Sequence, residues 1–414
     1  MNELAFPFAL LAFLGVSALP SQDLLEARAG FETAIVSERT ESEPLEEPPA
    51  DEFVIVSYPT PFGEASAYQT PLPQSDAKVP AIIWLTGGFP TGGGGSHLWE
   101  DFNPTNEQSA RAYRDAGIAM LFASTRGTSG NPGVQEGFFG EVDDVLAAAT
   151  YLRTLDGIDP DRIFLGGHST GGTLALLVAT ASDTFRGVIC FGPTDDPANY
   201  GRDQILYDAK NEQERALRAP IHHLNAISTP TFVIEGGRSS LTNAMNRLRE
   251  ASNNKRIEYL TIEGAGHFDV LDPCNRRIAE AILELQPKQK LRLSEKALRA
   301  AFELERKNLR EADDLISLAW ARRDMVDLDS PTTISYFLYA WDETDLRDAI
   351  ESAEQASFLA ENIQSKTDRD GDRYWYTYLQ KDLKLKDTKA VFRASESVQK
   401  IATQHDLEFE GWSL

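Results

Sequence analysis

Short apolar segments alternate with amphipathic segments between residues 53 and 287, and this alternation constrains the fold more than any other feature. Five apolar runs predict buried strands, at residues 81–85, 118–123, 162–166, 187–191 and 231–234. Helical spacing marks residues 141–155 and 173–180. Strands that are apolar on both faces must be covered on both sides, so the pattern predicts a mostly parallel, doubly wound α/β sheet. Ligands of such sheets bind at the carboxyl ends of the strands.

A serine motif stands at one of these strand ends. Gly167-His168-Ser169-Thr170-Gly171 directly follows the strand at 162–166 and opens the next helix. This pattern, G-x-S-x-G, is typical of a nucleophile elbow, a tight turn that exposes a serine above the sheet edge. We therefore expect Ser169 to be a nucleophile and the N–H of Thr170 to face an oxyanion. The other interpretation is a glycine-rich turn that only packs closely.

A serine hydroxyl needs a general base, and His267 is the candidate. It lies on a glycine-rich loop after the apolar strand at 259–262, and a histidine that follows the serine in the chain is typical of α/β-hydrolases. The second oxyanion donor is expected on the loop after the strand at 81–85, from the N–H of Gly88 or Phe89. The alternative for that loop is a flexible glycine segment.

Four sequence blocks resemble the catalytic domain of prolyl-oligopeptidase-type (peptidase S9-like) α/β-hydrolases. They are TGG at 86–88, RGTSGNPG at 126–133, GEVDDV at 140–145 and DPDRI at 159–163. The resemblance covers about residues 53–287 and implies that Ser169 is the nucleophile and His267 the base. It implies a serine hydrolase, an esterase or a serine-type peptidase, that forms an acyl-enzyme and needs no cofactor or metal.

Hydrolases of this family have a third catalytic group, an acid that orients the histidine. At the position of this acid the sequence departs from the family's pattern. The family normally has an aspartate on the loop after the penultimate strand, whereas residues 235–241 read EGGRSSL. We expect Glu235, at the end of the strand, to take this role. Asp195 or Asp196, on the loop after the strand at 187–191, are the alternatives. Glu235 could instead pair with Arg238, and either aspartate could cap the helix that follows.

The N-terminus has features of a secretory signal. Residues 4–19 carry no charge and Val16-Ser17-Ala18 has the small-x-small form of a cleavage site, although the preceding Glu3 has the wrong sign. We therefore expect residues 1–18 to be a signal peptide of a secreted or periplasmic protein, with an N-terminal anchor or a cytoplasmic protein as the alternative. Residues 19–52 are acidic and contain prolines, and we expect a linker there.

The last third of the chain predicts a helical connector and a second domain. Residues 288–330 contain one long charged helix, at 291–326, and the apolar pattern of residues 331–414 has the order β-α-β-β-α-β. That order predicts a small α+β domain of ferredoxin-like fold. Tyr374, Tyr376 and Tyr378 alternate along one predicted strand, and we expect them to face the core.

This second domain also resembles a known family. The segments ISYFLY at 334–339, DGD at 370–372 and FEGW at 409–412 resemble the regulator of ribonuclease E activity B. The resemblance covers about 80 residues and implies a ferredoxin-like domain that binds a protein partner. Ribonuclease inhibition does not follow, because that family acts in the cytosol and the N-terminus here predicts export.

Composition narrows the classes of function. The chain has 64 acidic and 40 basic residues, and this net charge of −24 argues against a nucleic-acid partner. Two cysteines and six histidines, without a Cys/His cluster, predict neither a disulfide scaffold nor a zinc site. We expect an ester or peptide substrate, a protein partner for the C-terminal domain and no stable membrane span. The alternative function is a non-catalytic hydrolase scaffold that regulates a partner.

Overall fold

The structure is a computed structural model, and it describes residues 24–73, 77–90, 94–100, 103, 105–323, 327–367, 373–405 and 407–413. The expected signal peptide, residues 1–18, therefore lies outside the described residues. No helix within the described ranges is both long enough and apolar enough to cross a bilayer. The chain divides into two compact units, residues 1–261 with 265–293, and residues 262–264 with 294–414.

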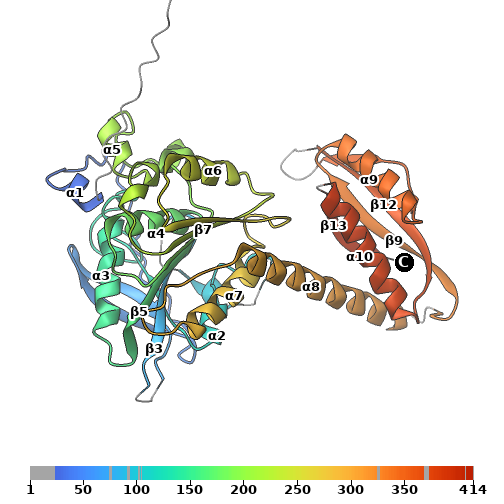
Figure 1. Ribbon diagram of the computed structural model, residues 1–414, viewed down its shortest axis with the longest axis horizontal. Helices are drawn as coiled ribbons and strands as arrows, with labels where there is room; N and C mark the ends of the chain where they lie inside the picture. Colours follow the sequence, from blue (N-terminus) through green and yellow to red (C-terminus); the bar gives the residue numbers. More distant parts are fainter. Residues whose placement is uncertain are drawn as a thin grey trace, which may run out of the picture. The chain divides into compact units, whose positions relative to one another are not determined.

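An eight-stranded sheet organises the larger unit (Figure 1), in the order β1-β2-β4-β3-β5-β6-β7-β8. The strands are β1 (Val54–Thr60), β2 (Gly63–Gln69), β3 (Val79–Leu85), β4 (Ala119–Ala123), β5 (Ile158–His168), β6 (Val188–Phe191), β7 (Thr231–Gly236) and β8 (Ile257–Ile262). The first two form an antiparallel hairpin, and the strands from β3 to β7 pair in parallel. The α/β class predicted from the apolar runs is confirmed.

Helices cover this sheet. They are α1 (Leu24–Arg28), α2 (Ala112–Asp115), α3 (Glu141–Arg153), α4 (Thr170–Ala181), α5 (Glu212–Ala216), α6 (Thr242–Ala251) and α7 (Leu271–Glu284). Every residue of α4 is buried, because this helix packs on β5 and β6 and also contacts α3. Burial of the apolar side chains on these elements supplies the main stabilisation of the unit.

The segment that was expected to be a linker packs on the larger unit instead. Leu24 is fully buried in the same hydrophobic cluster as residues of α4. Arg28 forms an ion pair with Asp143, with Nη2 and Oδ2 2.7 Å apart. The backbone N–H of Ala34 donates to Glu214 Oε1 at 2.6 Å. Composition does not predict this attachment, because it depends on a few apolar side chains and a few specific polar contacts rather than on a long apolar pattern.

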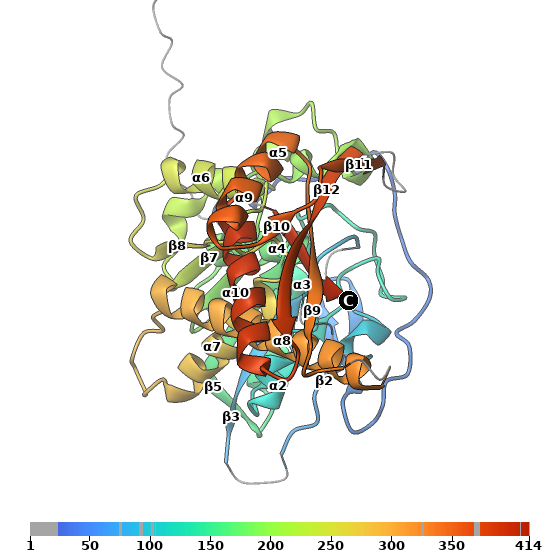
Figure 2. The same ribbon diagram turned by 90° about the vertical axis from the view of Figure 1, so that its right-hand side faces the viewer.

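The smaller unit begins with α8 (Glu295–Arg323) and continues through β9 (Pro331–Ala340), α9 (Glu343–Gln355), β10 (Leu359–Ala360), β11 (Gln364–Thr367), β12 (Arg373–Lys384), α10 (Thr388–Gln404) and β13 (Glu408–Ser413). The sheet order is β10-β12-β9-β13, with β11 also on β12, and the pairs are antiparallel. Figure 2 shows α9 and α10 beside these strands. This is the arrangement of the predicted ferredoxin-like domain, although the strand expected after α9 is two short strands.

The expectation that the tyrosines of β12 face the core is wrong. The core below α9 and α10 is filled from the other face of the sheet, by Tyr336 and Leu338 of β9 and Leu379 of β12. Tyr376 and Tyr378 are only half-buried, and their rings contact Phe337 and neighbouring aromatic rings on the opposite face. Alternation identified the shared face correctly, but it could not say which of the two faces the helices cover.

The attachment of residues 24–52 can be tested by mutation. We expect Leu24→Ala to lower the free energy of unfolding by about 2–5 kcal/mol, because it leaves a cavity in a closed core. The matched control is Leu25→Ala next to it, where the side chain is 41% exposed and the expected change is within about 0.5 kcal/mol. Urea unfolding of both variants measures this. Equal stability of the two variants would contradict the packing of α1.

Candidate active site

Ser169 occupies a strained turn between β5 and α4. Its backbone has φ 55° and ψ −115°, a conformation that costs energy for a residue with a side chain. Two glycines make the turn sterically possible: a Cβ on Gly171 would lie 2.1 Å from the carbonyl oxygen of Leu85, and one on Gly167 would lie 2.5 Å from Gly171. The N–H of Ser169 donates to Phe191 O at 2.8 Å. The turn is therefore anchored to β3 and β6.

The structure brings Glu235 and His267 together. Glu235, at the end of β7, is fully buried, and its Oε2 atom lies 3.0 Å from His267 Nδ1. The other carboxylate oxygen accepts the N–H of Gly236 at 2.7 Å. A carboxylate on Nδ1 fixes the tautomer in which this nitrogen carries the proton, which leaves Nε2 as the proton acceptor. The pair has the geometry of the base and acid of a hydrolase triad.

Gly192 gives this pair its space. It follows β6 with φ +52°, and a Cβ built on it would lie 2.4 Å from Glu235 Oε2 and 2.5 Å from His267 Cε1. Any side chain at this position would collide with both groups. Since Phe191 next to it accepts the N–H of Ser169, one short segment contacts the elbow and the acid–base pair together.

The two alternative acids are engaged elsewhere. Asp195 forms a bidentate ion pair with Arg247, with both N–O distances 2.7 Å. Asp196 caps the short 3₁₀ helix at Pro197–Tyr200 by accepting the N–H of Ala198 at 2.9 Å, and it also pairs with Arg215.

Arg238, the other partner considered for Glu235, forms an ion pair with Asp269 at 3.3 Å. These contacts give each side chain a structural role and leave Glu235 as the carboxylate on His267.

The loop after β3, where Gly88 or Phe89 is expected to supply an oxyanion donor, is tied to the start of α4. The Thr170 hydroxyl donates to the carbonyl oxygen of Gly88 at 2.5 Å. Gly88 has φ +93°, which favours glycine at this position. This bond holds the loop that contains Phe89 beside the N-terminus of α4, where unpaired N–H groups and the helix dipole favour a negative charge.

His168, which the serine motif predicts to pack beside Ser169 as a structural residue, is a neighbour of His267. His168 is fully buried, and its Nε2 lies 3.0 Å from the carbonyl oxygen of His267. The two rings are 4.3 Å apart. Burial and then the neighbouring His267 lower the pKa of His168 from 6.5 to about 3. His168 is therefore neutral at pH 7, and its ring N–H can hold the loop of His267 in place.

Three aromatic rings form a wall beside the serine that the sequence pattern did not reveal. Phe138 stacks on Tyr200 at 6.0 Å, and Phe89 meets Tyr200 edge-on at 5.5 Å. The Tyr200 hydroxyl shares a hydrogen bond of 2.7 Å with Thr173, one turn into α4 from the serine. The rings come from three loops that are distant in the chain, so no local motif could identify them. Their apolar faces can hold an acyl or leaving group.

Comparison with protein families supports this assignment of the fold. Residues 106–282 match the model of the prolyl oligopeptidase family, and residues 317–414 match the regulator of ribonuclease activity B. Both resemblances inferred from the motifs are confirmed for these ranges. The larger unit thus carries the fold and the family signature of a serine hydrolase. A search of curated protein sequences found no significant match.

Comparison with solved structures gives matches at a TM-score of 0.45. A 2,6-dihydroxy-pseudo-oxynicotine hydrolase has 16% identity and a TM-score of 0.45, over 59% of this chain and 71% of that one. A puromycin hydrolase has 19% identity and a TM-score of 0.45, over 58% and 41% of the two chains. The Pyrococcus horikoshii acylaminoacyl peptidase has 15% identity and a TM-score of 0.45, over 60% and 43%. This chain therefore spans about two fifths of the last two structures, and nothing about its substrate follows from them.

The steric role of Gly192 predicts a specific loss of nucleophile reactivity. We expect Gly192→Ala to slow labelling of the protein by a fluorophosphonate probe by at least about 100-fold, because a displaced base loses its alignment with the serine. Gly201→Ala is the matched control: it also has positive φ, +106°, but nothing lies within 4 Å of its Cβ position. The labelling rate of the control should stay within a few-fold of wild type. Equal rates for the two variants would contradict the crowding at Gly192.

Proposed function

We propose that this protein is a serine hydrolase that cleaves ester or peptide bonds through an acyl-enzyme on Ser169. The observation that carries the proposal is the buried Glu235 carboxylate 3.0 Å from His267 Nδ1, beside the Ser169 elbow. The match of residues 106–282 to the prolyl oligopeptidase family supports the same reaction class.

The proposed reaction gives each of these groups one role. His267 Nε2 removes the proton from Ser169 Oγ as this oxygen attacks the carbonyl carbon of the substrate. The resulting oxyanion accepts hydrogen bonds from the N–H of Thr170 and from that of Gly88 or Phe89. His267 then gives its proton to the leaving alcohol or amine, and the acyl group stays on Ser169. A water molecule repeats the sequence and releases the acid.

Glu235 supports His267 in both halves of this reaction. Its carboxylate holds the imidazole in the productive tautomer and stabilises the positive charge that forms on it. Glutamate is one carbon longer than aspartate, so it can reach the ring from the end of β7 itself. The absence of the family's usual aspartate therefore need not remove the acid.

Substitution of each proposed group tests the reaction. With p-nitrophenyl acetate and peptide p-nitroanilides as substrates, we expect Ser169→Ala and His267→Ala to lose turnover by at least about 10⁴-fold. Glu235→Gln should lose about 10²–10⁴-fold in kcat, because the tautomer is no longer enforced.

Asp195→Asn is the matched control, since Asp195 is the acid on the alternative loop and binds Arg247 instead. We expect it to keep kcat within a few-fold of wild type. A loss as large as that of Glu235→Gln, or full turnover by Ser169→Ala, would overturn the assignment. The ratio of ester to anilide turnover in the wild type distinguishes esterase from peptidase.

A non-catalytic scaffold is the rival function. The absence of the family's aspartate from residues 235–241 favours this function. The contact between Glu235 and His267 weakens that argument. Failure of the wild-type protein both to hydrolyse acyl substrates and to react with a fluorophosphonate would favour it.

For the C-terminal domain we propose a protein partner that contacts the half-buried aromatic face of β9 and β12. A photo-crosslinking residue at Tyr376 should then give a discrete adduct in cells, whereas one at Arg393 on α10 should not. Adducts from Arg393 alone would contradict this choice of face.

We also propose that the protein is exported with loss of residues 1–18. The small-x-small sequence at Val16-Ser17-Ala18 supports this proposal. N-terminal sequencing of the protein from the cells that produce it should begin at Leu19. A cytosolic protein that retains Met1 would contradict export.

A further inference from the structure

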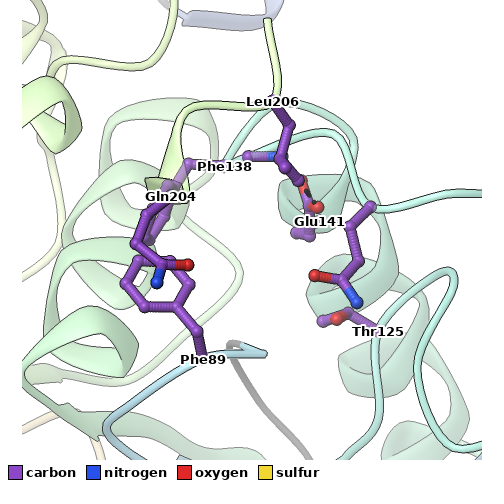
Figure 3. Close-up of a pocket in the computed structure, with 8 residues that line it drawn as sticks. Phe89, Thr125, Phe138, Glu141, Gln204 and Leu206 are labelled. Carbon is purple, nitrogen blue, oxygen red and sulfur yellow. Dashed lines mark hydrogen bonds between the residues drawn. The ribbon is translucent and has the colours of Figure 1, made fainter. Parts of the chain in front are cut away.

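A small pocket lies next to the loop after β3, which contributes Phe89 to its lining. Its lining residues are Phe89, Thr125, Gln135, Gly137, Phe138, Glu141, Gln204 and Leu206. In Figure 3, Phe89 and Gln204 lie on one side of the opening, and Glu141 and Thr125 lie on the other. It has room for a group about the size of one water molecule or one ammonium. Phe89 belongs both to this pocket and to the aromatic wall, so the two features share one ring.

Glu141 lines this pocket, and one of its carboxylate oxygens has no hydrogen-bond partner among the described residues. The residue is 4% exposed and begins α3. Its Oε1 atom accepts the backbone N–H groups of Glu136 at 2.7 Å and Gly137 at 3.1 Å. Its Oε2 atom is buried and has no hydrogen-bond partner among the described residues. A buried carboxylate oxygen normally has a partner, since its desolvation is otherwise uncompensated.

Arg126, whose charge lowers the pKa of Glu141, directs its hydrogen bonds to other carboxylates. Arg126 donates to both oxygens of Asp144, from Nε at 3.0 Å and from Nη2 at 2.9 Å, and to Glu136 Oε1 at 2.8 Å. One guanidinium thus lies among three carboxylates, and its donors are directed at Asp144 and Glu136 rather than at Glu141. Burial raises the pKa of Glu141, and the charge of Arg126 opposes that shift. One guanidinium beside three carboxylates leaves an excess of negative charge in the cluster.

Two further arginines near the pocket are also engaged. Arg218 pairs with Glu214, with Nη1 and Oε2 2.5 Å apart. Arg39 donates to Gln204 Oε1 at 2.6 Å and to the carbonyl oxygen of Asp203. Neither contact involves the Oε2 atom of Glu141.

The pocket wall carries backbone strain. Phe138 has φ +74°, a conformation that few residues with side chains adopt. Such strain persists where the surroundings enforce it, and it gathers at ligand sites. Ser169 is strained in the same way, with φ 55°.

We propose that this pocket binds a primary ammonium group of the substrate, with Glu141 Oε2 as its anionic acceptor and the Phe89 ring beside it. This specificity rests on the proposed hydrolase function. An ammonium matches the size of the pocket, supplies the missing hydrogen-bond donor and balances the excess negative charge. A cation beside an aromatic ring gains further attraction from the face of the ring.

The test uses four lysine p-nitroanilides, or the matching esters if the enzyme cleaves esters alone. The free amino acid derivative has both ammonium groups, the Nε-acetyl derivative has the α-ammonium, the Nα-acetyl derivative has the ε-ammonium, and the diacetyl derivative has none. We expect at least one singly charged substrate to exceed the diacetyl one by about 10–100-fold in kcat/KM, as a charged hydrogen bond in a buried site allows. The preferred one identifies the source of the ammonium.

Glu141→Gln should remove this preference and keep the diacetyl substrate within a few-fold of wild type, because the amide oxygen can still accept the two N–H groups that Oε1 accepts now. Asp143→Asn is the matched control: it removes a charge from the same turn of α3, but it pairs with Arg28 and does not line the pocket. We expect it to retain the preference. A charge preference that survives Glu141→Gln, or none in the wild type, would overturn the proposal.

A readout independent of turnover separates this proposal from the proposed function. n-Butylamine should raise the melting temperature of Ser169→Ala protein more than n-butanol does, and this difference should vanish when Glu141→Gln is added. Absence of hydrolysis with a retained n-butylamine shift would reject the hydrolase and keep the pocket. Equal shifts with the two compounds would reject the ammonium site itself.

Discussion

The site depends on one contact, the hydrogen bond between the buried Glu235 carboxylate and His267 Nδ1. It sets the tautomer of the histidine, and it can exist only because Gly192 leaves the space that a side chain would fill. The constraint extends to Ser169, whose N–H is bonded to Phe191, the residue before Gly192. A buried carboxylate this close to the ring gives the histidine, whose side chain is 19% exposed, a fixed orientation.

The parallel sheet explains why these groups meet. The strands β3, β5, β6 and β7 run in the same direction, so the loops that follow them leave one edge. At this edge lie, in turn, the loop that contains Gly88 and Phe89, the serine elbow, Gly192 and Glu235. Tight backbone contacts around the elbow then set the distances, as the required absence of a Cβ at Gly171 shows. The pocket at Glu141 extends the same arrangement, since Phe89 of the loop after β3 forms part of its wall.

Much of the fold could be predicted, because apolar runs and helical spacing reflect burial directly. The strands at β3 to β7 and the helices α3 and α4 fall where the pattern placed them. Ser169 and His267 were identifiable from local motifs and chain order, whereas Glu235 was one of three candidates until its distance to His267 was known. The contacts of His168, Tyr200 and Glu141 could not be predicted from the sequence, since they join segments far apart in the chain. Two predictions were wrong for a related reason, the linker at Leu24 and the core-facing tyrosines of β12. Composition and alternation do not specify the packing partner.

The most direct test of the central claim is to trap the acyl-enzyme. The full-length protein is mixed rapidly with p-nitrophenyl acetate, quenched in acid, and digested for mass spectrometry. The account predicts one acetyl group on the peptide that contains Ser169, formed at the rate of the p-nitrophenol burst and greatly reduced in His267→Ala. An acetyl group on other residues alone, with turnover intact, would show that the contact between Glu235 and His267 serves the structure and not an acyl transfer.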